Sequence, residues 1–154
     1  MKALVLYDSK FGNTKIIAQT VAEVLAGQLV SINDFKPAIV TEMDVVVVGS
    51  PIHAWHPSEA TDEFLMHLEK SELKGKYVAA FDTGYKSNFA GNAANRIIKA
   101  LEKAGGTALI ATHKFIVEHS EGPLGPEEIA RADIWAHDLI TQYERITQTS
   151  KLGI

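Results

Sequence analysis

The sequence predicts a three-layer α/β/α fold, in which a five-stranded parallel sheet carries helices on both faces. Short apolar runs alternate with segments of helical period along the whole chain. This β-α order, repeated five times, favours a parallel sheet. The four consecutive valines Val45 to Val48 fit a strand that is buried on both faces. Right-handed crossovers then give the strand order 2-1-3-4-5.

The individual elements follow from the spacing of apolar residues. We expect strands at 3–7, 28–32, 45–48, 77–81 and 107–112, and residues 114–117 extend the last strand if the chain kinks there. We expect helices at 14–26, 58–69, 92–103 and 126–146. Pro126 suits the first turn of the last helix. The predicted inward face of that helix consists of Ile129, Ala132, Ala136, Leu139, Tyr143 and Ile146.

The composition is that of an ordinary globular chain of 154 residues, enough for one domain. Lys and Arg total 15 and Asp and Glu total 19, so the formal net charge is -4. This argues against a nucleic-acid partner, which needs a basic face. No apolar stretch approaches the ~20 residues that span a bilayer, so we expect no membrane partner and a cytoplasmic location. The absence of cysteine excludes disulfides, iron–sulfur ligation and thiolate catalysis.

The loop after the first strand reads Ser9-Lys10-Phe11-Gly12-Asn13-Thr14 and runs straight into a helix. Ligands of such sheets bind beyond the carboxyl ends of the strands, where the winding reverses. Gly12 permits a positive φ, and the free N–H groups of the first helical turn attract an anion. Ser9 and Thr14 can donate from their hydroxyls. We interpret the loop as a nest for a terminal phosphate, and a tight turn with a helix cap is the alternative.

The pattern Ser-x-x-Gly-Asn-Thr after a first strand resembles the phosphate loop of flavodoxins. The resemblance continues in order through the next two strand-end loops and covers nearly the whole chain. It implies one flavodoxin-like domain over residues 1–154 that binds one FMN non-covalently, with the phosphate wrapped by residues 9–14. It also implies an electron carrier that serves redox partner proteins, as yet unidentified, and acts as a monomer or weak dimer.

The loop after the third strand, 49–57, holds a tryptophan between two histidines. A planar flavin needs flat apolar faces, and tryptophan offers a large one. The resemblance implies that this loop supplies one aromatic wall of the flavin site. Trp55 matches that wall best, with Ile52 and His53 as alternates.

The loop after the fourth strand, 81–92, resembles the flavodoxin loop that binds the pyrimidine edge of the ring. Thr83 and Gly84 would present backbone groups to that edge. Tyr85 is the candidate second wall, with Phe89 or Lys86 as the competing neighbour. The predicted FMN-binding residues are therefore Ser9, Lys10, Phe11, Gly12, Asn13, Thr14, Pro51, Ile52, His53, Ala54, Trp55, Asp82, Thr83, Gly84, Tyr85 and Phe89.

The segment before the final helix, 118–124, contains Glu-Gly-Pro-Leu and resembles a subgroup of short bacterial and archaeal flavodoxin-domain proteins. It either closes over the flavin or merely turns the chain. We favour the turn, because Gly and Pro mark turns first of all.

Other chemistries find less support in the sequence. The six histidines show no His-x-x-x-His or His-Glu-x-x-His spacing, so we predict no metal site, and His67 and His137 are expected at the surface. One-electron carriage needs no general acid, so we predict no catalytic residue. An FMN-dependent quinone or porphyrinogen oxidoreductase on the same fold is the alternative function. A phospho-receiver would need an acceptor Asp at the end of the third strand, where Gly49-Ser50 stands.

Overall fold

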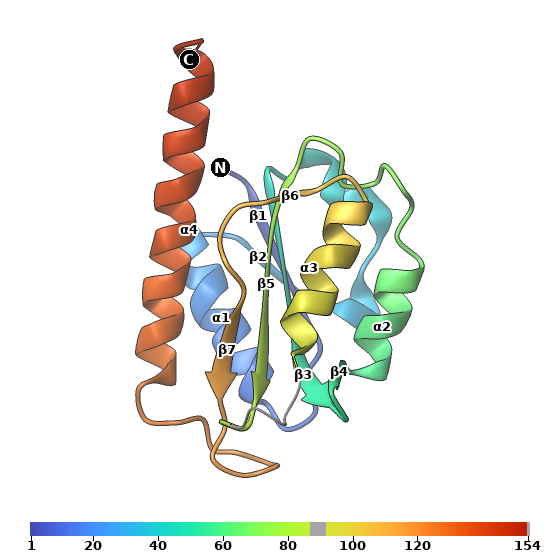
Figure 1. The fold of residues 1–154 in the computed structure, drawn as a ribbon, viewed down its shortest axis with the longest axis vertical. Helices are drawn as coiled ribbons and strands as arrows, with labels where there is room; N and C mark the ends of the chain where they lie inside the picture. Colours follow the sequence, from blue (N-terminus) through green and yellow to red (C-terminus); the bar gives the residue numbers. More distant parts are fainter. Residues whose placement is uncertain (87–91, 154) are drawn as a thin grey trace.

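A parallel sheet forms the centre of the molecule (Figure 1), in a computed structural model that describes residues 1–86 and 92–153. The order runs β2-β1-β3-β5, and β6 and β7 both pair with β5. A short strand, β4, pairs antiparallel with the end of β3. The predicted fold class and the order 2-1-3-4-5 are confirmed, with β6 and β7 as two pieces of the fifth strand. The strands are β1 (Ala3–Tyr7), β2 (Gln28–Ser31), β3 (Val45–His53), β4 (His56–Pro57), β5 (Tyr77–Gly84), β6 (Thr107–Ala108) and β7 (His113–Ile116).

Helices cover both faces of this sheet (Figure 1). Helices α1 (Asn13–Leu25) and α4 (Glu128–Lys151) pack on one face, and α2 (Glu59–Met66) and α3 (Ala93–Lys103) pack on the other. Between β2 and β3 the chain forms two 3-10 helices, η1 (Ile32–Asp34) and η2 (Pro37–Glu42), where the second of the five predicted β-α repeats would place an α-helix. Pro37 starts η2 and would break a helix that began upstream of it.

Strands β3 and β5 are longer than the predicted 45–48 and 77–81. Their ladder continues through the pairs Gly49↔Phe81, Ser50↔Asp82 and Pro51↔Thr83. Small and polar residues give no strand signal by themselves, but pairing with the neighbouring strand holds them extended. The carboxyl ends of both strands therefore carry polar residues into the edge where ligands bind in this class of sheet.

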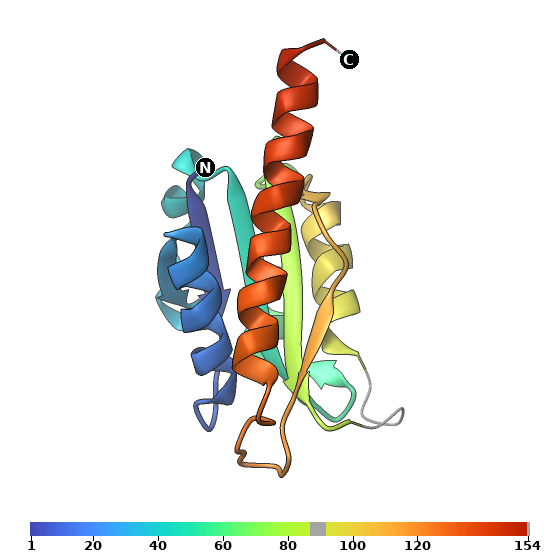
Figure 2. The ribbon, with the colours of Figure 1, turned by 90° about the vertical axis from the view of Figure 1, so that its left-hand side faces the viewer.

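The last helix differs from its prediction in its face and its ends. Ile129, predicted inward, is 51% exposed, whereas Trp135 is buried at 6% and its indole N–H donates to the carbonyl of Ala111 at 3.1 Å. The helix begins at Glu128 rather than Pro126 and runs to Lys151. Its final turns project beyond the rest of the body (Figure 2).

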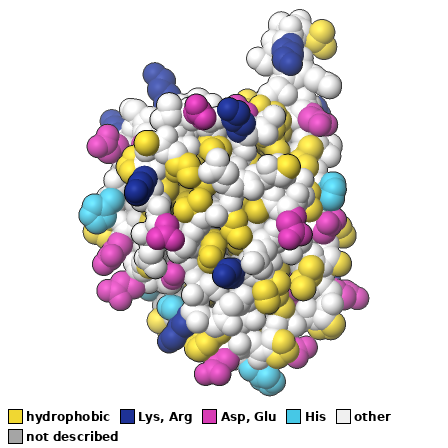
Figure 3. Space-filling view, turned by 180° about the vertical axis from the view of Figure 1, so that it is seen from behind, with side chains coloured by type: hydrophobic (Ala, Val, Ile, Leu, Met, Phe, Trp, Pro, Cys, Tyr) yellow, Lys and Arg dark blue, Asp and Glu magenta, His cyan; other side chains and the backbone are white. Residues whose placement is uncertain are grey.

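The surface carries charges of both signs. The face seen in Figure 3 shows acidic and basic side chains interspersed, without one continuous basic field. His67 and His137 are exposed, as predicted. Within residues 1–86 and 92–153, no helix combines the length and the apolar character needed to cross a bilayer.

Candidate functional site

A cavity of about 430 Å³ opens at the carboxyl ends of β1, β3 and β5. It brings together most of the residues that the sequence singles out. Gly12 and Asp82 do not line it, and Phe89 lies outside the described residues, together with the rest of 87–91. Val117 and Ser120 line it without having been predicted. The lining residues are Ser9, Lys10, Phe11, Asn13, Thr14, Pro51, Ile52, His53, Ala54, Trp55, Thr83, Gly84, Tyr85, Val117 and Ser120.

The loop between β1 and α1 forms one end of the cavity. Gly12 has φ 96°, and a Cβ added there would meet nothing within 4 Å. The Ser9 Oγ accepts hydrogen bonds from the N–H of Gly12 at 3.1 Å and of Lys15 at 3.3 Å. Within the described chain, the N–H groups of Phe11, Asn13 and Thr14 have no protein acceptor. These free donors at a helix N-terminus suit an anion.

A buried hydroxyl pair joins this loop to β5. The Thr14 and Thr83 hydroxyls lie 2.8 Å apart, and the two residues are only 1% and 4% exposed. One hydroxyl donates to the other, and a buried hydrogen bond of this kind is costly to break, because its partner is left unsatisfied. The pair fixes the start of α1 relative to the end of β5, from which Gly84 and Tyr85 reach the cavity.

The end of β3 turns back into β4 as a hairpin with a two-residue loop, Ala54-Trp55. Both loop residues have positive φ, 47° and 69°. Such a turn normally uses Asn-Gly or Asp-Gly, because other residues are strained in this conformation. The loop holds the Trp55 side chain at the cavity, 63% exposed. His53 also lines the cavity, whereas His56 turns away and lies against Arg96.

Three aromatic side chains stand at the edge of the cavity. Trp55 is 63% exposed, Phe11 47% and Tyr85 45%. Exposed aromatic rings are unfavourable in water unless something covers them. The Lys10 ammonium lies 5.3 Å from the centre of the Phe11 ring and adds a positive charge near the free N–H groups. The cavity thus combines flat apolar faces with a cationic, donor-rich end.

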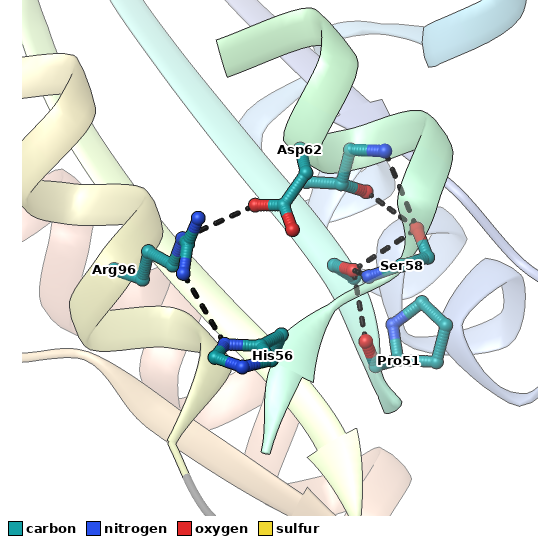
Figure 4. Close-up of polar contacts among 7 residues, drawn as sticks. Pro51, His56, Ser58, Asp62 and Arg96 are labelled. Carbon is teal, nitrogen blue, oxygen red and sulfur yellow. Dashed lines mark hydrogen bonds and ion pairs between the residues drawn. The ribbon is translucent and has the colours of Figure 1, made fainter. Parts of the chain in front are cut away.

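A chain of buried hydroxyls supports the base of the hairpin (Figure 4). The Ser50 Oγ donates to the carbonyl of Pro51 at 2.9 Å and accepts from the N–H of Ser58 at 3.0 Å. Ser58 caps α2 by accepting from the N–H of Thr61, and their hydroxyls lie 2.8 Å apart. Ser50, Ser58 and Thr61 are 0%, 2% and 0% exposed.

Asp82 points away from the cavity, toward the start of α3. Its Oδ2 accepts from the N–H of Ala94 at 2.9 Å, and its Oδ1 is buried with no partner among the described residues. Burial raises the pKa of the Asp82 carboxyl to about 6, against the hydrogen bond from Ala94, which lowers it. Along a strand, neighbouring side chains alternate between the two faces, so Thr83 reaches the cavity and Asp82 does not.

The segment after β7 forms a further wall. Val117 and Ser120 line the cavity. The Asn13 Nδ2 donates to the carbonyl of Glu121 at 3.2 Å, and a Cβ on Gly122 would lie 2.8 Å from the Asn13 Oδ1. The segment therefore borders the cavity beside the first loop, so it is more than the simple turn favoured from the sequence. Sequence reasoning missed this contact because Asn13 and Glu121 are 108 residues apart, and no local pattern relates them.

Known proteins resemble this chain along most of its length. A family model described as "Flavodoxin domain" matches residues 4–116. A curated protein named "Flavodoxin", from Maridesulfovibrio salexigens, is 31% identical over 119 residues, covering 70% of this chain and 81% of that protein. Oxidised Flavodoxin 2 from Bacillus cereus superimposes with a TM-score of 0.81 at 21% identity, covering 92% of this chain and 99% of that chain. A flavodoxin from the domain Archaea gives 0.79 at 23% identity, with 94% and 99% covered.

Proposed function

The chain belongs to the flavodoxin family, and from this premise we propose that it binds one FMN in the cavity and carries electrons between partner proteins. One observation supports the proposal above the others. A single cavity combines free N–H groups at the start of α1 with exposed aromatic faces on two other loops. FMN presents a phosphate at one end and a planar ring at the other, so its two ends call for these two kinds of surface.

The phosphate end is assigned to residues 9–14. The free N–H groups of Phe11, Asn13 and Thr14 would donate to the phosphate oxygens, and the α1 dipole favours negative charge there. The Ser9 hydroxyl already accepts two backbone hydrogen bonds, so it shapes the loop and leaves its own proton for the anion. Among the described residues that line the cavity none is acidic, which favours an anionic group there.

The ring end is assigned to Trp55 and Tyr85. Their exposed faces would be covered by a flat ring, which removes apolar area from water. When bound, FMN supplies the electron-transfer chemistry, and the protein supplies position and electrostatic environment. This chain's residues bind and orient the cofactor, and no side chain needs to move a proton for one-electron carriage.

The direct test is titration of the purified apoprotein with FMN and with riboflavin. We expect flavin absorbance bands at about 1:1 occupancy with FMN, strong quenching of flavin fluorescence, and much weaker riboflavin binding, since riboflavin lacks the phosphate. Equal affinities for the two flavins would contradict the phosphate assignment, and no binding of either would overturn the proposal. Steady NAD(P)H oxidation by the pure flavoprotein would show an enzyme rather than a carrier.

The stacking assignment has its own test. Trp55→Ala is expected to relieve flavin quenching and weaken FMN binding by about 1–3 kcal/mol, the range for losing an aromatic platform. Trp55→Phe keeps a flat ring and should retain most of both signals. If Trp55→Ala leaves quenching and affinity unchanged, another residue forms that wall.

A further inference from the structure

The β3–β4 hairpin has little to hold its own tip in place. Its ladder contains two residue pairs, Ile52↔Pro57 and His53↔His56. A two-stranded ladder of this length is marginally stable by itself. Above it, Ala54 and Trp55 both adopt positive φ, which costs of order 1–3 kcal/mol for each non-glycine residue. Such a conformation persists only where surrounding groups hold it.

The buried hydroxyls of Ser50 and Ser58 hold the base of the hairpin and do not reach its tip. Beside the tip, the Arg96 Nη1 lies 3.2 Å from the His56 Nδ1 (Figure 4). A guanidinium only donates, so the His56 Nδ1 accepts, and the proton of the neutral ring is on Nε2. The Arg96 Nε lies 3.2 Å from the Asp62 Oδ1. Arg96 thus joins β4 to α2 and α3.

We propose that Arg96 is a positioning residue that holds the strained hairpin, and with it Trp55, in the orientation that walls the cavity. The inference rests on the proposed function for the role of Trp55. Arg96 stands on α3 and Asp62 on α2, and both helices pack on the sheet core. The planar guanidinium uses two separate nitrogens, one for His56 and one for Asp62, so it fixes a direction as well as a distance.

The expected effect is moderate, because the contacts are partly in water. The Arg96 side chain is 53% exposed and that of Asp62 is 27% exposed, and exposed ion pairs contribute little to overall stability. The hairpin tip is different, because the hydrogen bond between Arg96 and His56 ties β4 directly to α3. Removal of Arg96 should therefore leave global unfolding almost unchanged and loosen Trp55 specifically.

The first experiment needs no flavin. The chain has two tryptophans, so apoprotein labelled with 5-fluorotryptophan gives one ¹⁹F resonance for Trp55 and one for Trp135. Arg96→Met should shift and narrow the Trp55 resonance, because the side chain, already 63% exposed, loses its fixed orientation, and should leave that of Trp135, in the core, in place. Lys99→Met is the matched control on α3: it makes the same charge change, and the Lys99 side chain makes no ion pair or hydrogen bond with any described residue. An unchanged Trp55 resonance in Arg96→Met would overturn the inference.

The second experiment measures FMN affinity in a double-mutant cycle of Arg96→Met and His56→Leu. Each single variant should weaken FMN binding by about 3–10-fold, and the double variant should be little worse than either, because both remove one contact. The FMN affinity of Arg96→Lys should fall between those of the native protein and Arg96→Met, because an ammonium keeps the charge but not the planar, two-nitrogen geometry of the guanidinium. If the two losses of FMN affinity add fully in the double variant, Arg96 and His56 do not act through a shared contact. If the native protein binds no FMN, the proposed function fails, while the ¹⁹F result still decides the inference.

Discussion

Both ends of the cavity require a backbone with positive φ, and different residue types provide it at each end. At the start of α1 the chain needs one positive φ, and a glycine, Gly12, provides it without strain. At the tip of the β3–β4 hairpin it needs two, and Ala54 and Trp55 provide them at a conformational cost. The backbone of the first loop is therefore unstrained, whereas the second loop depends on neighbouring residues to hold a strained backbone.

This difference predicts where each region is vulnerable. The first loop should fail when its own residues change, because its geometry and its free N–H groups are local. The hairpin should respond to changes in residues that support it from elsewhere, such as Ser50 and Arg96. The predictions below test that contrast, starting from the largest expected effect.

Gly12→Val should lower FMN affinity on the order of a thousandfold while the protein remains folded. A β-branched residue opposes φ 96°, and its Cβ would project into the open space beside the free N–H groups. Gly75→Val is the matched control, since Gly75 has φ 80° and equally open surroundings but lies just before the start of β5, at the opposite end of that strand from the cavity. The measurement is a fluorescence titration with thermal unfolding in parallel. Retained tight binding in Gly12→Val would exclude the loop as the phosphate site.

Asp82→Asn should change how stability depends on pH. The native carboxyl has its pKa raised from 3.8 to about 6, so between these values the folded protein holds more protons than the unfolded chain. Its contribution to stability is therefore fully present below pH ~3.8 and is lost as pH rises through about 6, a loss of about 3 kcal/mol. The variant lacks this loss, so its stability relative to the native protein should rise from pH 4 to pH 7.

Chemical denaturation across that range measures the difference, with Asp138→Asn, an exposed site on α4, as the control. A constant offset between Asp82→Asn and the native protein would mean that the folded and unfolded states titrate alike. Because Asp82 and Ser50 are paired across β3 and β5, this test also concerns the polar layer under the hairpin.

The contrast also explains what could be predicted from the sequence. The phosphate loop is a local pattern, in which glycine and hydroxyl residues between a strand and a helix specify both the turn and its chemistry. The hairpin escaped prediction because Ala-Trp carries no turn signal, and its support comes from Arg96 on another helix. Val117 and Ser120 escaped because they approach the cavity from a segment over 100 residues beyond the phosphate loop.

The orientation of Asp82, in contrast, could have been predicted from the sequence. Alternation along a strand places adjacent side chains on opposite faces, so Asp82 and Thr83 could not both reach the cavity. Once β5 is known to extend to Gly84, the rule excludes Asp82. The predicted strand ended at 81, and that error in length hid the alternation.

Ala54→Asn should stabilise the apoprotein by about 0.5–1 kcal/mol, because asparagine tolerates the left-handed conformation that strains alanine. Ala26→Asn is the matched comparison, since Ala26 also has a positive φ, 49°, but sits at the exposed end of α1. Denaturant midpoints of the two variants give the measurement. A stabilising effect at Ala26 with none at Ala54 would show that the hairpin conformation is not strained in solution.

The smallest expected effect separates the two histidines that flank the hairpin loop. His53 lines the cavity, whereas the His56 Nδ1 is engaged by Arg96. Flavin reduction adds negative charge to the ring, and a positive charge at the cavity stabilises the reduced state. Two unit charges ~8 Å apart in water interact by about 0.5 kcal/mol, which is about 20 mV on the one-electron scale. Potentiometric titration should therefore give a reduction potential higher by about this amount in His53→Lys than in His53→Gln. His56→Lys and His56→Gln should differ less, because this side chain faces Arg96 rather than the cavity. Equal potentials for the two His53 variants would show that a charge at this position is fully screened from the ring.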